Sequence, residues 1–460
     1  MTEAQLETEA HEAGTAPTSE LVHAVAEALD ADDTDRVRKL LADVHGPDLA
    51  DLIELLAPEE RVALIQALGP DFDFEVLAGV DEKVRDQIAE ALPNEALAKA
   101  VTELDSDDAA YIIGGLEADD QKEILDQLPQ GDRAAVQRNL TYPEETAGRL
   151  MQADFVAVPP FWTVGQVIDF ARETADLPET FSEIFVVDPG FHLLGSVDIS
   201  RLLRSRRDVH IDKIMDPDRH QVLATADQEE VARQFERYGL MAAPVVDKNE
   251  RLVGVVTVDD VVEVIEQEAD EDAKLLAGVG DERITDSVRQ ITPPRFSWLL
   301  VNLLTAILAS AVISIFDTTI QSMVALAVLM PIVASMGGNA GTQTMTVAVR
   351  ALATKELTAA NVVRVVIRET AVGLINGLAF ALIMALIAVA WFGTNQLGLI
   401  IGTAMIVNLL AAALAGIFIP LALNRMGFDP AVSSTVFVTT VTDVVGFFSF
   451  LGLASLWLAK

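Results

Sequence analysis

The sequence contains no cysteine, which excludes disulfide bonds, thiolate metal sites and cysteine nucleophiles. Its six histidines show no spacing typical of metal ligands. The first 20 residues are polar and acidic and lack the charged and then apolar segments of a signal peptide, so we expect the N-terminus to stay in the cytoplasm. No constellation of catalytic residue types is visible, and we do not expect an enzyme.

Basic residues are scarce in the N-terminal part. The chain has 70 acidic and 32 basic residues, of which residues 296–460 hold only five and six. The first 295 residues therefore hold 65 acidic and 26 basic residues, a net charge of −39. Such a balance repels nucleic acid, so no nucleic-acid partner is expected, and it concentrates divalent cations. Solubility or salt adaptation would account for the same charge.

The soluble part begins with a polar segment, 1–19, which we predict to be a disordered acidic tail. In residues 20–147, apolar residues recur at helical spacing after acidic or proline-containing starts, as in 55–68 and 77–92. Short stacked helices of this kind indicate an all-α superhelical domain.

A second repeat fills residues 148–266. FVVD at 185–188 and LLGSV at 193–197 match PVVD at 244–247 and LVGVV at 252–256, and each copy opens with a methionine, Met151 or Met215. This pattern resembles a tandem pair of α/β CBS domains, 148–208 and 209–266. CBS pairs commonly bind adenine nucleotides, so ATP between the copies and a purely structural pair both remain open.

An acidic segment leads out of the second copy. Residues 258–278 are long enough for one continuous helix, and we assign 259–290 as an acidic plug or connecting helix. Carboxylates this dense repel one another at i,i+4 spacing, so a cation should lie nearby. The alternative is a solvated connector.

Five apolar stretches form a predicted transmembrane domain, 296–460, and each approaches or exceeds the length that spans a bilayer. They lie at about 296–316, 322–348, 362–392, 397–423 and 431–458. Basic residues flank the second and fourth connections only, so the positive-inside rule predicts cytoplasmic soluble domains and a C-terminus outside. We expect a multi-pass protein of the cytoplasmic (inner) membrane.

Polar groups interrupt the second and fifth stretches. Pro331 and the run MGGNAGTQT at 336–344 predict a broken helix whose free carbonyls line protein or water. Asn339 and Gln343 supply oxygen atoms that suit hard cations, although small residues also serve as packing faces. An ionised Asp443 at membrane depth costs about 2.5 to 3.5 kcal/mol, and a cation is its natural counter-charge.

PIVASMGGNAGTQT at 331–344, DPAV at 429–432 and VTTVTDVVGF at 438–447, with the five helices, the CBS pair and the acidic N domain, resemble the MgtE family of magnesium channels. The resemblance implies a homodimer with a pore on its two-fold axis, where Asp443, Asn339, Thr435 and Thr439 meet hydrated Mg²⁺. It also implies that the acidic helix closes the cytoplasmic mouth when Mg²⁺ is abundant.

The resemblance further implies a set of cytosolic Mg²⁺-sensing acids. Two departures accompany it: Tyr111 and Gly239 stand where relatives have sensing acids, and Val436 stands where the fifth helix commonly has proline. The implied sensing residues are Asp429, Glu75, Asp107, Asp227, Glu229, Asp260, Glu263, Glu268, Glu271 and Asp272.

Two rival functions remain open. The first is a secondary transporter that couples a divalent cation to Na⁺ or H⁺ through Asp443, with Co²⁺ as an alternate substrate in either case. The second is a membrane-tethered nucleotide sensor whose helices only anchor it in the lipid bilayer.

Overall fold

The computed structural model describes residues 17–69, 72–174, 177–178, 180–217, 220–280, 282, 288–432 and 434–459. Most of the predicted tail, residues 1–16, lies outside these residues, and Ser19 already begins a helix. The chain divides into two compact units, Met1–Glu266 and Gln267–Lys460.

The first unit opens with short helices, which confirms the predicted all-α N domain. Polar side chains cap several of them: Thr18 accepts from the backbone N–H of Leu21, and Asp33 accepts from that of Arg36. The helices are α2 (Ser19–Asp30), α3 (Thr34–Leu41), α4 (Gly46–Leu55), α5 (Pro58–Leu68), η2 (Phe74–Leu77), α6 (Glu82–Ala91), α7 (Asn94–Glu103), α8 (Ser106–Gly114), α9 (Ala118–Gln127), α10 (Gln130–Leu140) and α11 (Ala147–Leu150).

One continuous apolar core holds the N-domain helices together. Leu52 and Ile53 of α4, Leu64 of α5, Ile88 of α6 and Ile113 of α8 are almost fully buried in it. None of these helices exceeds 12 residues in the described part of the domain, so each is too short to be stable alone and depends on this packing.

The two CBS copies have the same element order, which confirms the predicted pair. In each copy the first strand pairs parallel with the second, and the second pairs antiparallel with the third. The elements are β1 (Ala157–Val158), α12 (Val164–Glu173), β2 (Glu183–Val187), β3 (Leu193–Asp198), α13 (Ile199–Arg204) and η3 (Ile211–Lys213), then β4 (Val222–Leu223), α14 (Gln228–Tyr238), β5 (Ala242–Val246), β6 (Leu252–Thr257) and α15 (Val258–Leu276).

The repeated motifs have matching structural roles. Oδ1 of Asp188 accepts from the backbone N–H groups of Gly190 and His192, and Oδ1 of Asp247 accepts in the same way from those of Asn249 and Arg251. The VVD sequence therefore closes the turn between the last two strands of each copy.

The opening segments of the two copies cross over. Gln152, which opens the first copy, pairs with Val255 of the second, and Asp216, which opens the second, pairs with Ser196 of the first. A Cβ on Gly254 would lie 2.7 Å from the Gln152 carbonyl oxygen. A glycine is needed in each crossing because the backbone of the other copy passes so close.

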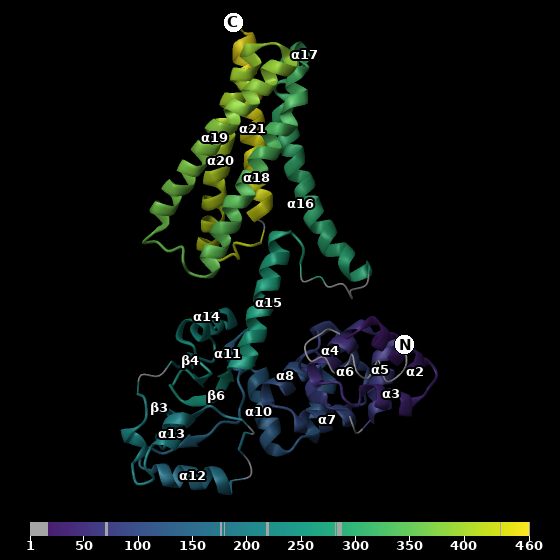
Figure 1. The fold of residues 1–460 in the computed structure, drawn as a ribbon, viewed down its shortest axis with the longest axis vertical. Coiled ribbons are helices and arrows are strands. Elements are labelled where there is room, and N and C mark those ends of the chain that lie inside the picture. Colours follow the sequence, from purple (N-terminus) through teal and green to yellow (C-terminus); the bar gives the residue numbers. More distant parts are fainter. Residues whose placement is uncertain are drawn as a thin grey trace. The chain divides into compact units, whose positions relative to one another are not determined.

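Five helices in the described part of the second unit are long and apolar enough to cross a membrane. α18, α19, α20 and α21 pack side by side around a shared core (Figure 1). The helices of this unit are α16 (Val288–Ser314), the short α17 (Asp317–Ser322), α18 (Ala325–Ala353), α19 (Val362–Phe392), α20 (Asn395–Arg425) and α21 (Ser434–Leu458).

The predicted break in the second membrane helix is wrong, because α18 runs continuously through Pro331 and the glycine run. The glycines are packing positions instead. A Cβ on Gly337 would strike Asn408 of α20, and a Cβ on Gly341 would strike Val438 of α21. Small residues let membrane helices approach closely, which was the alternative reading of this motif.

We predict that Gly416→Ala destabilises the membrane unit. The added Cβ would lie 2.8 Å from the carbonyl oxygen of Gly341 and 3.0 Å from the Met345 nitrogen. Both are backbone atoms of α18, so the helices must separate, at about 1 to 3 kcal/mol. Thermal unfolding in detergent measures the loss. Gly452→Ala is the control, since its Cβ meets only ordinary contact at 3.8 Å; equal melting temperatures for the two variants would contradict the prediction.

Candidate ion path and cation-sensing sites

Asp443 lies in the middle of α21 and is half-buried. The described residues offer its carboxylate no hydrogen-bond donor and no cationic side chain. A membrane helix tolerates such a group only where it faces a polar interior, water or a cation. The carboxylate is therefore available to a species from outside the single chain.

A polar face runs along α18. Ser335, Asn339, Gln343, Thr346 and Arg350 follow one another at helical spacing and are all accessible in the single chain. Such a row is unsuited to hydrocarbon, because polar groups there lose their hydrogen bonds to water. It marks the side of α18 that faces water or other protein when the helix spans a bilayer.

α18 and α21 approach each other in the segment that carries the motifs. A Cβ on Gly338 would touch the Cγ2 atom of Thr439 at 3.9 Å, and Asp443 lies one helical turn beyond Thr439. The Thr439 hydroxyl donates to the Thr435 carbonyl, 2.9 Å away. Its oxygen keeps lone pairs that can accept from the water shell of a cation.

Thr435, predicted for the pore, contacts the end of α15. Its hydroxyl donates to the carbonyl oxygen of Leu276 at 2.9 Å. Leu275 and Leu276 also pack on a small cluster that includes Met345, Val349 and Val438. The C-terminal end of the acidic helix is thereby attached to α18 and α21.

Two predicted sensing acids meet at this junction. Burial raises the pKa of Asp272 above its ordinary value, the charge of Asp429 raises it further, and Arg350 lowers it. The Arg350 guanidinium lies 3.9 Å from the Asp272 carboxylate and is mostly exposed. Asp429 also caps its own turn by accepting from the Ala431 backbone N–H at 2.8 Å.

The first unit brings a second group of acids together. Asp107 of α8 and Asp260 of α15 face each other closely enough for the charge of one to raise the pKa of the other. Asp108, which sequence reasoning missed, interacts in the same way with Asp260, Glu263 and Glu75. We call the five residues Glu75, Asp107, Asp108, Asp260 and Glu263 the acidic cluster.

Burial is the main perturbation in the acidic cluster. Asp107 is only 7% exposed, and its Oδ1 atom has no hydrogen-bond partner in the described part of the chain. Burial, followed by the charge of Asp260, raises the pKa of Asp108 to about 7. Burial also raises the pKa of Asp260 to about 7, although a hydrogen bond from Thr257 opposes the shift. Binding of a proton or a cation would therefore stabilise these buried carboxylates.

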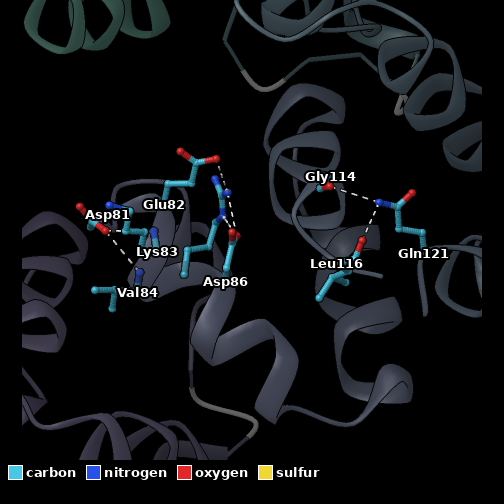
Figure 2. Close-up of polar contacts among 9 residues, drawn as sticks. Asp81, Glu82, Lys83, Val84, Asp86, Gly114, Leu116 and Gln121 are labelled. Atoms are coloured by element: carbon cyan, nitrogen blue, oxygen red, sulfur yellow. Dashed lines mark hydrogen bonds and ion pairs between the residues drawn. The ribbon is translucent and has the colours of Figure 1, made fainter. Parts of the chain in front are cut away.

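α6 carries a buried arginine that contacts α8. Arg85 of α6 is 1% exposed, binds Asp86 at 2.9 Å and stacks on the Tyr111 ring, 3.4 Å from its centre. Figure 2 shows the same helix start, where Asp81 accepts from the backbone N–H groups of Lys83 and Val84. Tyr111, which stands where relatives have a sensing acid, therefore makes a cation–π contact with an arginine.

The other predicted sensing residues lie at the start of α14 and on α15. Asp227 caps α14 through the Glu229 backbone N–H, and Gly239 ends that helix in a left-handed conformation. Glu271 is exposed and Glu268 half-buried on α15. Within the described ranges, no three His, Asp or Glu side chains are arranged to hold a metal ion directly.

Comparison with known proteins identifies the family. Family models match residues 330–453 (MgtE, divalent cation transporter), 44–145 (MgtE intracellular N domain) and 211–267 (CBS domain). A magnesium transporter MgtE of Thermus thermophilus is 34% identical over 447 residues, which cover 95% of this chain and 98% of that protein. The chain belongs to the MgtE family of magnesium transporters.

A second curated relative agrees. The Bacillus subtilis magnesium transporter MgtE is 27% identical over 419 residues, covering 91% of this chain and 93% of that one. The solved cytosolic domain of an Mg²⁺ channel MgtE in complex with ATP is 34% identical and covers 53% of this chain and 99% of that one, with a TM-score of 0.49. The family model and the match to the Thermus thermophilus transporter over 95% of the chain show Mg²⁺ transport as its activity.

We predict that the acidic cluster destabilises the first unit at high pH. The folded-state pKa values of Asp108 and Asp260 are about 7, against an ordinary 3.8, so the folded state binds more protons and its unfolding free energy falls as pH rises between these values. Asp108→Asn should stabilise the unit by roughly 1 kcal/mol or more near pH 8, and by less near pH 5.

Hydrogen exchange of the backbone of α8 in the full-length protein measures the change in the unfolding free energy of the first unit. Asp43→Asn is the control, because Asp43 is exposed and lies outside the cluster. Mg²⁺ added near pH 8 should increase protection in the parent protein and have a smaller effect in Asp108→Asn. Equal protection of α8 in the parent protein and in Asp108→Asn, both near pH 5 and near pH 8, would contradict the prediction.

Proposed function

We propose that this MgtE protein is a Mg²⁺-selective channel for magnesium uptake across the cytoplasmic membrane. The observation that carries the proposal is the Asp443 carboxylate, which has no partner within the described chain and lies beside Thr439 on a membrane helix. Mg²⁺ gives up its water reluctantly, so a carboxylate and hydroxyl oxygens contacting its hydration shell suit it. Asn339 and Thr435 complete the proposed lining.

The proposed active form is a homodimer with the path on its two-fold axis. The polar face of α18 supports this, since Asn339 and Gln343 would otherwise meet lipid. A second copy would double Asp443 and give the ion two carboxylates. The basic residues Arg350, Arg364, Arg368 and Arg425 at one set of helix ends favour cytoplasmic soluble domains and an outside C-terminus.

The proposed regulation is closure by cytosolic Mg²⁺. Carboxylates repel one another in the acidic cluster and between Asp272 and Asp429. Mg²⁺ bridging such acids would relieve the repulsion and favour the arrangement that keeps them together. Because Thr435 bonds the end of α15, that arrangement also fixes the acidic helix against a proposed pore residue.

A coupled transporter is the alternative. In liposomes, the channel should pass Mg²⁺ or Co²⁺ down the membrane potential with no Na⁺ or H⁺ gradient, and strict dependence on such a gradient would favour coupling. An anchored nucleotide sensor would carry no flux. ATP between the CBS copies stays a prediction, and nucleotide binding to the full-length protein in equilibrium dialysis tests it.

We predict that Asp443→Asn strongly lowers Mg²⁺ flux. The substitution keeps the shape of the side chain and removes the charge that attracts the ion, and loss of a charged contact of this kind lowers flux by roughly tenfold or more. Mg²⁺ entry into liposomes and growth of a strain deficient in Mg²⁺ uptake both report it. Asp317→Asn, in α17 with Gln321 as its hydrogen-bond partner, is the control. Normal flux through Asp443→Asn at equal protein would refute the path proposed here.

We predict that Asp272→Asn weakens the response to internal Mg²⁺. Without the charge of Asp272, Asp429 is no longer repelled and the ion loses one ligand, so fluxes at low and at high internal Mg²⁺ should become more alike. Asp270→Asn is a matched control on the same helix, where Asp270 pairs with Lys274 at 2.6 Å. The quantity to compare is the ratio of the two fluxes in liposomes; an unchanged ratio would remove Asp272 from the sensor.

A further inference from the structure

An amide is fully buried in the membrane unit. Asn408, near the middle of α20, is 0% exposed. Its Nδ2 donates to the Val333 carbonyl oxygen of α18 at 2.8 Å, and its Oδ1 has no hydrogen-bond partner in the described chain. Burying an amide oxygen without a hydrogen bond costs free energy. A polar residue kept at such a position in a membrane helix is therefore expected to have a function.

Two glycines make room for this amide. A Cβ on Gly337 of α18 would lie 2.2 Å from Nδ2 and 3.0 Å from Oδ1 of Asn408. A Cβ on Gly446 of α21 would lie 2.8 Å and 3.2 Å from the same atoms. Asn408 therefore contacts α18 and α21 at two glycines, where an added Cβ would collide with its amide.

The two glycines lie next to the proposed pore residues. Gly337 precedes Asn339 by two residues on α18, and Gly446 follows Asp443 by three residues on α21. In a helix these separations are less than one turn. Any shift of α18 along α21 at Asn408 would therefore move Asn339 relative to Asp443.

We propose that Asn408 is a positioning residue that fixes α18 against α21 and so sets the spacing of Asn339 and Asp443 on which ion selectivity depends. Asn408 does not touch the ion. It acts through its hydrogen bond to Val333 and its contacts with Gly337 and Gly446. The proposal rests on the proposed role of Asp443.

The test compares Mg²⁺ and Ca²⁺ fluxes through full-length protein in liposomes, read with an ion-sensitive dye. We expect Asn408→Ala to lower the Mg²⁺/Ca²⁺ flux ratio about threefold to tenfold, the change that loss of one hydrogen bond allows. The half-saturating Mg²⁺ concentration should also rise. A ratio does not depend on how much protein is folded, so a merely structural role would leave it unchanged.

A second variant covers the case in which Asn408→Ala does not fold. Gly446→Ala places its Cβ against the Asn408 amide and should lower the ratio in the same direction. The double variant should lower it no further, because the new Cβ occupies space that Asn408 leaves. Gly452→Ala on the same helix is the control and should keep the parent ratio.

The outcomes separate this proposal from the proposed function. If Asp443→Asn conducts normally, the ion path itself is wrong. If Asp443→Asn lowers flux as predicted while Asn408→Ala and Gly446→Ala both keep the parent ratio and half-saturation, Asn408 is only a structural residue and the present proposal is overturned.

Discussion

A carboxylate in a membrane helix needs a counter-charge or water, and the second unit contains one, Asp443, that has no partner among the described residues. Asp443 is only half-buried, whereas Phe450 and Leu451, farther along α21, pack into the apolar core shared with α18, α19 and α20. The helices must therefore pack closely behind the carboxylate and leave one side open. Glycines at the contacts of α18, α19 and α20 permit that packing.

The same electrostatic problem recurs in the soluble part in another form. Single acids on short helices are harmless in water, but burial at the contact of α8 and α15 brings Asp107, Asp108 and Asp260 into a region of low dielectric. Without a bound cation, these buried carboxylates lower the stability of the first unit. The buried Arg85 of α6 pairs with Asp86 and stacks on the Tyr111 ring instead.

Features encoded within one segment were predictable from sequence. The repeated VVD and G-V motifs identified the CBS pair, and the cost of an isolated acid in an apolar stretch singled out Asp443 as a candidate, whose role in the ion path stays a prediction. Features that depend on contacts between distant segments were not. The spacing of Asp108 resembles that of many surface acids, and Asn408 differs from an ordinary polar residue only through the two glycines that face it.

The error over α18 has the same origin. Proline and glycine weaken a helix in water, so their presence at 331–341 suggested a break. In the folded unit, the free energy of packing against Asn408 and Val438 exceeds that local preference, and the helix stays intact. Context of this kind is not visible in a single sequence without the partner helices.

The crossed opening segments of the CBS copies make the pair one folding unit. Gln152 completes hydrogen bonding at Val255, Asp216 does so at Ser196, and Phe185, Val187, Val246 and Leu252 share one core. Neither copy can open its edge without exposing backbone groups of the other. A disturbance that enters at one copy, whether from a ligand or from the helix that leaves the second copy, is therefore felt by both together rather than being absorbed by one.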